Sequence, residues 1–203
     1  MAYATVDDFI LYGKHTSMSS NDALVTALLA QSQDAIDDYC KRTFEADSDT
    51  VGSSSAYMTR YFDAIADVEG SELFLDRDLC EINTVISDTN TVTSDNYVTN
   101  PRNDAPFYSI KILGSSSDSW TYTTDPENAI SVSGIWAYSK TAPPIVKYAT
   151  LRLTNWFYKQ RVADLDADRP IQTQYGFAVM PSAWPADVKQ ALDPLRRNSV
   201  YGI

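Results

Sequence analysis

Apolar residues recur at helical spacing near both ends of the chain, whereas short β-prone runs fill its middle. Thr5, followed by two carboxylates, predicts the start of a short helix that stops at Gly13. A second start at 19–22 precedes residues 20–44, which contain no glycine or proline and predict a helix of about 20 residues. Its apolar stripe consists of Val25, Leu28, Leu29, Ser32, Ile36 and Tyr39.

The middle of the chain holds short runs of β-prone residues divided by turn-forming residues. The runs are 57–62, 73–75, 82–86, 96–98, 107–113, 120–122 and 130–136. One divider, Asp76-Arg77-Asp78, has the Asp-x-Asp form of some metal sites, but we interpret it as a turn, which aspartate favours for local reasons. Strands roughly every ten residues predict an antiparallel sheet or a small barrel.

Helical spacing returns after Pro143, and a last helix is expected from Pro185 until Pro194 ends or kinks it. Residues 162–183 between them are predicted to form a long loop of polar to mixed composition that contains Pro170, Gly176 and Pro181, and loops of this length more often serve a function.

The predicted fold class is therefore α+β. It is a small helical bundle, with two long helices plus short first and last helices, carrying an inserted antiparallel β-sheet or barrel region. The predicted domains are a helical core of residues 1–56 and 138–203 and an inserted β domain of residues 57–137.

Composition and charge narrow the class of protein. Hydrophobic residues make up 44% and charged residues 21%, which is typical of a globular chain. The net charge of −11 argues against a nucleic-acid binder, which needs clustered lysine and arginine. The charge is −6 over 1–56, −8 over 57–142 and +3 over 143–203. This asymmetry is compatible with self-association, although chance variation explains it equally well.

Several other classes of protein are not supported. No apolar run approaches the ~20 residues that a membrane span needs, and we expect no secretory signal. Two distant cysteines, Cys40 and Cys80, exclude a disulfide framework and favour a reducing compartment. The chain has one histidine, no phosphate-binding glycine loop and no Gly-x-Ser-x-Gly motif. We therefore expect no catalytic residue, no cofactor and no metal ion.

Several strings along nearly the whole chain are informative together: MAYATVDDF at 1–9, AIDDYCKRTF at 35–44, TRYFD at 59–63, LFLDRDL at 73–79, PIVKYA at 144–149, WFYKQR at 156–161 and WPADVKQALDPLRR at 184–197. In this order they resemble segments of the head–tail connector (adaptor) proteins of long-tailed bacteriophages. The longer members of that family have a β insertion.

The resemblance implies a homo-oligomeric ring, usually of twelve copies, that joins the capsid to the tail below the portal protein. Its partners would be the portal and a tail or neck-closure protein, with no membrane and no enzymatic activity. The protein would lie at the head–tail junction of the virion, after assembly in the host cytoplasm. DNA would pass through the lumen without specific binding, and an acidic ring suits this because it repels phosphate.

Two other functions remain open. One is a tail-completion or carbohydrate-binding module whose site lies in the β region. The more distant one is an enzyme with a carboxylate site around Asp76 and Asp78.

Two interfaces are expected for a ring component. The segment after Pro194 combines basic and apolar side chains, as interface hot spots do, although a frayed C-terminus is the competing interpretation. Its predicted portal-contacting residues are Arg196, Arg197, Val200, Tyr201 and Ile203. The 162–183 loop is the predicted contact between subunits, through Asp164, Arg169, Gln174, Tyr175 and Phe177.

Overall fold

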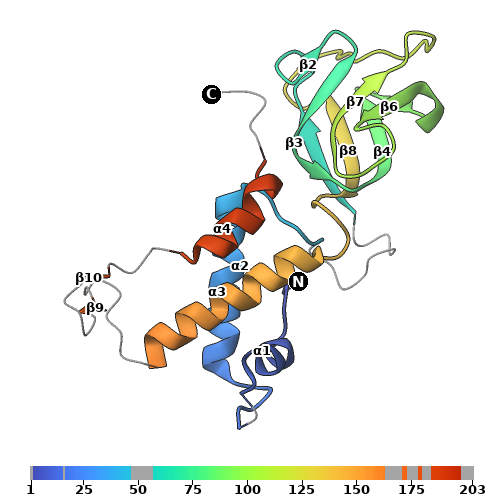
Figure 1. The fold of residues 1–203 in the computed structure, drawn as a ribbon. Coiled ribbons are helices and arrows are strands. Elements are labelled where there is room, and N and C mark those ends of the chain that lie inside the picture. The colour runs from blue at the N-terminus through green and yellow to red at the C-terminus, as the bar shows by residue number, and fades with distance from the viewer. Residues whose placement is uncertain are drawn as a thin grey trace. The chain divides into compact units, whose positions relative to one another are not determined.

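The computed structural model describes residues 2–15, 17–46, 57–162, 171–172, 178–179 and 184–197. Contacts divide the chain into two compact units, a β unit of residues 42–142 and a helical unit of residues 2–41 and 143–203 (Figure 1). That the predicted domains fold independently of each other stays a prediction.

The β unit consists of two four-stranded sheets in which every neighbouring pair of strands is antiparallel. The first sheet has the order β1 (Met58–Phe62), β8 (Ile130–Ile135), β4 (Glu81–Ser87) and β5 (Asn90–Val92). The second has the order β2 (Val68–Glu69), β3 (Glu72–Leu79), β7 (Phe107–Ile112) and β6 (Tyr97–Asn100), the last preceded by a 3-10 turn, η2 (Ser94–Asn96).

Both sheets contribute to one hydrophobic core. Ile130 and Val132 of β8 are fully buried and alternate with serines that are only half-buried, as expected for a strand with one face on the core. In the second sheet, Leu73 of β3 and Ile110 of β7 are fully buried and belong to the same hydrophobic cluster as Ile130 and Val132. The complete cluster is Phe62, Leu73, Leu75, Leu79, Val85, Val92, Ile110, Ile112, Ile130 and Val132.

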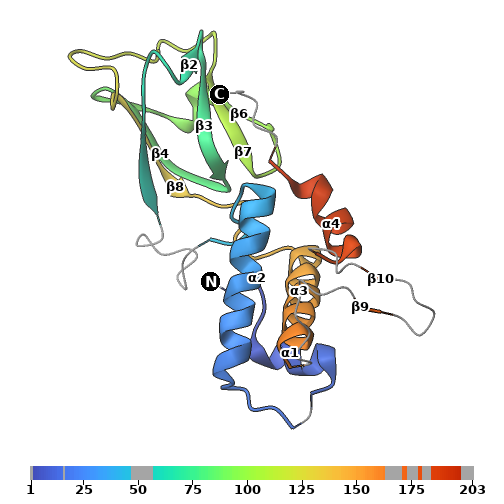
Figure 2. The same cartoon turned by 90° about the vertical axis from the view of Figure 1, so that its left-hand side faces the viewer.

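The helical unit holds four α-helices (Figure 2) over its described residues. They are α1 (Val6–Gly13), α2 (Ala23–Cys40), α3 (Pro144–Val162) and α4 (Ala186–Leu192), with a 3-10 turn, η3 (Asp193–Leu195), after α4. Helix α2 lies beside α3, and α3 also contacts α1 and α4. Within the predicted 162–183 loop, β9 (Ile171–Gln172) and β10 (Ala178–Val179) pair as a short antiparallel ribbon.

Local hydrogen bonds fix the ends of the first two helices. Thr5 and Asp8 form a reciprocal capping box at the start of α1, and the Asp22 side chain accepts from the Val25 amide at the start of α2. Both predicted starts are confirmed. Each helix ends at a lysine in the left-handed region, Lys14 at φ 56° and Lys41 at φ 55°.

A small core joins the helices. Phe9 of α1, Val25 and Leu29 of α2 and Leu151 of α3 form one buried cluster. Beside it, the buried Thr154 hydroxyl donates to Ser32 Oγ across the α2–α3 contact at 2.9 Å. Ser32 in turn donates to the Leu28 carbonyl, so these buried hydroxyls are hydrogen-bonded.

The predicted fold class, a helical bundle of two long helices with an inserted sheet or barrel, is wrong. Over the described residues, the four helices have 8, 18, 19 and 7 residues, and the eight strands of the two four-stranded antiparallel sheets dominate the fold. The reason is that helical periodicity is a strong local signal, whereas short strands are weakly periodic and gain their stability from pairing. A prediction from sequence periodicity therefore overestimates the share of the helices in the fold.

Two details of the predicted β region are also wrong. Residues 120–122 form no strand, and the Trp120 indole instead donates to the Ser71 carbonyl at 2.8 Å while its ring packs on the core. Asp76 and Asp78 are not in a turn but lie inside β3, where the register against β7 shifts between Phe74 and Leu79. Such an irregularity lets consecutive residues depart from strict alternation.

Candidate functional site

The two carboxylates that the sequence marks as a possible metal site lie in different environments of β3. Asp76 and Arg77 are both exposed, whereas Asp78 and Leu79 are both buried. The register shift against β7 produces this pattern, because it breaks the alternation of faces along the strand.

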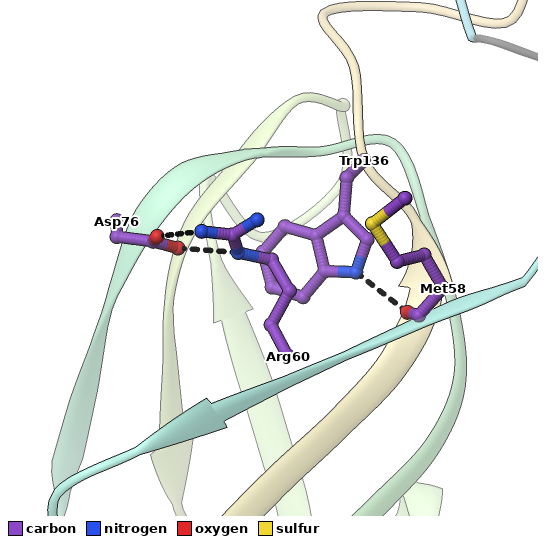
Figure 3. A network of polar contacts seen from close by, with 4 residues as sticks. All are labelled: Met58, Arg60, Asp76 and Trp136. Atoms are coloured by element: carbon purple, nitrogen blue, oxygen red, sulfur yellow. Dashed lines mark hydrogen bonds and ion pairs between the residues drawn. The ribbon is translucent and has the colours of Figure 1, made fainter.

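Asp76 is held by Arg60 of the edge strand β1 (Figure 3). Arg60 Nε donates to Asp76 Oδ1 at 3.0 Å, and a second guanidinium nitrogen donates to Oδ2, so the pair is bidentate. The guanidinium carbon lies 5.4 Å from the centroid of the Trp136 ring, and the Trp136 indole donates to the Met58 carbonyl at 2.8 Å. Arg60 thus stacks on an indole that is itself fixed by the backbone.

Asp78 is held by a different arginine inside the β unit. Arg42 Nε lies 3.5 Å from Asp78 Oδ2, and the two side chains are 7% and 2% exposed. The Arg42 guanidinium also lies 5.1 Å from the centroid of the Tyr138 ring. Each carboxylate therefore has its own arginine, and among the described residues no group of three or more His, Cys, Asp and Glu side chains could hold a metal ion.

Neither cysteine lies in a setting that activates a thiolate. Cys40 is fully buried at the end of α2, as the sequence predicts for a small hydrophobic residue. Burial raises the pKa of Cys80 to about 11, against a smaller opposing effect of Lys140. Lys140 also pairs with Glu81, and its hydrogen bond, with one from Tyr57, holds the pKa of Glu81 below its usual range.

The predicted portal-contacting segment is fixed to its own unit as far as Arg197. The Arg196 guanidinium lies 5.0 Å from the centroid of the Tyr39 ring on α2, and the Arg197 amide donates to the Cys40 carbonyl at 2.8 Å. The Tyr39 hydroxyl donates to Asp193, which raises the pKa of Tyr39. The chain after α4 therefore does not leave its own unit over residues 195–197, because Pro194 lies inside η3 and Arg196 and Arg197 contact the end of α2.

The remaining predicted interface residues lie outside the described residues. They are Val200, Tyr201 and Ile203 of the portal-contacting set and all the predicted subunit-contacting residues, Asp164, Arg169, Gln174, Tyr175 and Phe177. Their roles stay predictions.

The structure also shows a surface that the sequence analysis missed. Tyr12 of α1 and Tyr148 of α3 meet edge to face, with ring centroids 6.3 Å apart. Leu11 adjoins Tyr12, and Ile145 lies one helical turn before Tyr148. We call Leu11, Tyr12, Ile145 and Tyr148 the α1/α3 patch. Their exposed fractions are 78%, 37%, 41% and 43%.

Two ion pairs flank the α1/α3 patch. Lys147 Nζ lies 2.8 Å from Asp8 Oδ1, and Arg152 Nε lies 2.8 Å from Asp187 Oδ2. Burial acts to raise the pKa of Asp8, but the hydrogen bonds from Lys147 and Thr5 outweigh it and lower this pKa. The hydrogen bond from Arg152 likewise lowers the pKa of Asp187. Apolar side chains with a polar, charged rim are the usual make-up of a protein–protein contact surface.

Across the part of the chain that the structure describes, none of the helices combines the length and the apolar character needed to cross a lipid bilayer.

No protein-family model matches this sequence, and no curated protein matches it in a sequence search. Solved structures do share its fold. A chain in the neck of a native GTA particle, computed with C12 symmetry, aligns at a TM-score of 0.54 and 12% identity over 97% of this chain and 93% of that chain. A chain in the neck of an empty GTA particle, computed with C6 symmetry, aligns at 0.53 and 13% identity over 91% of this chain and 83% of that chain.

Proposed function

We propose that this protein is a structural component of the neck of a tailed phage or a phage-like particle. The observation that carries the proposal is the likeness to a GTA neck chain over 97% of this chain and 93% of that one. Because the alignment spans nearly the whole of both chains, it includes the β unit and the helical unit together.

Within the neck, we assign the protein the role of an adaptor that forms a ring, of about twelve copies, between the portal and the tail or neck-closure protein. The C12 symmetry of the neighbour's structure supports a ring, because heterologous contacts close only when the rotation divides a full turn. The net charge of −11 per copy supports a lumen that lets DNA slide, since clustered acidic groups repel phosphate.

A structural role also accounts for the chemistry of the described residues. The carboxylates of Asp76 and Asp78 form ion pairs with Arg60 and Arg42. Burial raises the pKa of the Cys80 thiol, which disfavours the reactive thiolate. These arrangements support a protein that has no enzymatic activity and that works through its surfaces.

The alternative of a carbohydrate-binding module has weaker support. A sugar-binding site usually needs an open aromatic face. In the β unit the Trp136 ring is stacked under Arg60, which is paired with Asp76 (Figure 3), whereas Tyr61 is 63% exposed and offers such a face. Binding of the unassembled protein to a glycan array, lost in Tyr61→Ala, would favour this alternative.

Co-sedimentation with tail-less capsids that carry portals tests the proposed function directly. The full chain should pellet with these capsids and should not pellet with capsids that lack a portal. Electron microscopy of the pellet should show an added ring at the portal vertex. A protein that never binds portal-bearing capsids, and that forms no ring by native mass spectrometry, would contradict the proposal.

A further inference from the structure

The α1/α3 patch contains every large apolar side chain that the described part of the helical unit exposes. On α3, Tyr148 lies three residues after Ile145, Arg152 four residues after Tyr148, and Lys159 seven residues after Arg152. These spacings place the four side chains on one stripe of the helix. Ile145, Tyr148 and Lys159 of this stripe are exposed and Arg152 is half-buried, whereas Val146 and Leu153, on another side of the helix, are fully buried. Helix α3 therefore presents an apolar and basic face to the outside.

Helix α2 presents an outward face of opposite charge. The outward positions that share this face are Thr26, Ala27, Ala30, Gln31, Asp34 and Asp38, all of them exposed. Helix α2 contains three acidic residues and no basic one, whereas α3 contains four basic residues and no acidic one. The acidic residues of α2 lie in its second half, at 34–38, whereas the basic residues of α3 are spread from 147 to 161.

The two outward faces are separate surfaces of the helical unit. Helices α2 and α3 pack against each other (Figure 2), and the exposed positions of each helix are different from the positions that are buried. A ring needs this arrangement, because each copy must contact one neighbour with one surface and the other neighbour with a different surface. A patch that paired with itself would give a closed dimer instead.

We infer that the α1/α3 patch docks on the outward face of α2 of a second copy of this chain. The inference rests on the proposed function, since it names the contact that builds the ring. Leu11, Tyr12, Ile145 and Tyr148 supply the apolar centre of this contact. Lys147 and Arg152 are already paired with Asp8 and Asp187 of the same chain. Lys159, an exposed basic residue that continues the stripe, faces the exposed carboxylate of Asp34 on the neighbour, and charge complementarity of this kind selects the partner surface.

Photo-crosslinking tests which surface the patch touches. Benzoylphenylalanine replaces Tyr148 in an isotopically light full chain, which is mixed with heavy wild-type chain before assembly. After irradiation, we expect the crosslinks between light and heavy peptides to concentrate on residues 23–40 of the heavy chain. Rings whose crosslinks map to any other element would overturn the inference and leave the proposed function standing.

Matched variants test whether the patch drives assembly. Ile145→Ser with Tyr148→Ser should lower the assembled fraction at least tenfold by analytical ultracentrifugation, while circular dichroism shows an unchanged fold. The control removes the same residue types from the β unit, as Tyr61→Ser with Ile65→Ser, whose side chains are 63% and 60% exposed. This control should assemble as the wild type does.

A second pair of variants tests the facing surface. Ala30→Arg places bulk and positive charge on the outward face of α2 and should also lower the assembled fraction at least tenfold, whereas Ala30→Ser should assemble normally. Normal assembly of the Ile145/Tyr148 variant or of Ala30→Arg would overturn the inference. A wild-type chain that stays monomeric, alone and with portal-bearing capsids, would overturn both the inference and the proposed function.

Discussion

Arg42 and Asp78 form an ion pair inside the β unit, with Nε 3.5 Å from Oδ2 and both side chains more than nine-tenths buried. Arg42 stands at the beginning of the β unit and Asp78 in the middle of it, on β3. The pair therefore fixes the entering chain to the second sheet. A buried pair of this kind is costly to break, because removal of one partner leaves the other charge without compensation.

Asp78→Asn should lower the free energy of unfolding by about 3–5 kcal/mol, because Arg42 then remains charged and buried. Asp76→Asn is the matched control on the same strand. Its pair with Arg60 is partly exposed, at 27% and 49% for the two side chains, so we expect a loss of only about 0–1 kcal/mol. Urea unfolding followed by circular dichroism measures both. Equal losses for the two variants would show that burial does not set the strength of these pairs.

Gly134→Ala should destabilise the first sheet of the β unit by about 2–3 kcal/mol. A Cβ at Gly134 would lie 2.1 Å from the Glu81 carbonyl oxygen, where backbone meets backbone and no side chain can move aside. Gly114→Ala is the control, since a Cβ there meets nothing within 4 Å. Thermal melts of the two variants give the comparison, and an unchanged midpoint for Gly134→Ala would contradict the close approach of β4 and β8.

Asp37 should make the helical unit less stable as the pH rises. Burial raises the pKa of Asp37 to about 6 from the ordinary 3.8, against the opposing hydrogen bond from the Tyr3 hydroxyl. Between about pH 4 and pH 6, the folded state therefore binds more protons than the unfolded state. The stability that the protonated Asp37 carboxyl contributes is lost as the pH rises through that window.

Asp37→Asn removes the titrating group but keeps an oxygen that can accept from Tyr3. Relative to the wild type, the variant should gain at most about 1 kcal/mol in stability between pH 4 and pH 7, a figure that allows for solvent screening of a half-buried group. Asp38→Asn serves as the control, because Asp38 is exposed and pairs with Lys41 at the surface. Parallel pH profiles for the wild type and Asp37→Asn would refute the prediction.

Tyr39 should determine how firmly residues 193–197 lie on the end of α2. Tyr39→Ala removes both the ring under Arg196 and the hydroxyl that donates to Asp193, so exchange of the Arg197 amide hydrogen should accelerate about tenfold or more. Tyr39→Phe keeps the ring and should give a smaller acceleration. Hydrogen exchange followed by mass spectrometry reads this amide, and an unchanged rate in Tyr39→Ala would show that η3 alone fixes the segment.

Short-range chemistry was enough to predict several local features from the sequence. The caps at Thr5 and Asp22 are correct because a capping side chain bonds to amides within three residues. The run at 130–136 contains the strand Ile130–Ile135 because β-branched residues alternating with serines favour a half-buried pleat. The run at 107–113 contains the strand Phe107–Ile112, which is rich in aromatic and β-branched residues. Burial of Cys40 follows from its place on the apolar side of α2.

Only the tertiary structure decided how these elements combine and what they leave exposed. Asp76-Arg77-Asp78 looks like a turn by composition, but pairing of β3 with β7 and two arginines from distant segments keep these residues in a strand. Tyr12 and Tyr148 belong to helices far apart in the sequence, and their contact creates a surface that neither helix predicts alone. The physical reason is that strand pairing, ion pairing and surface patches depend on distances in space, which local periodicity does not encode.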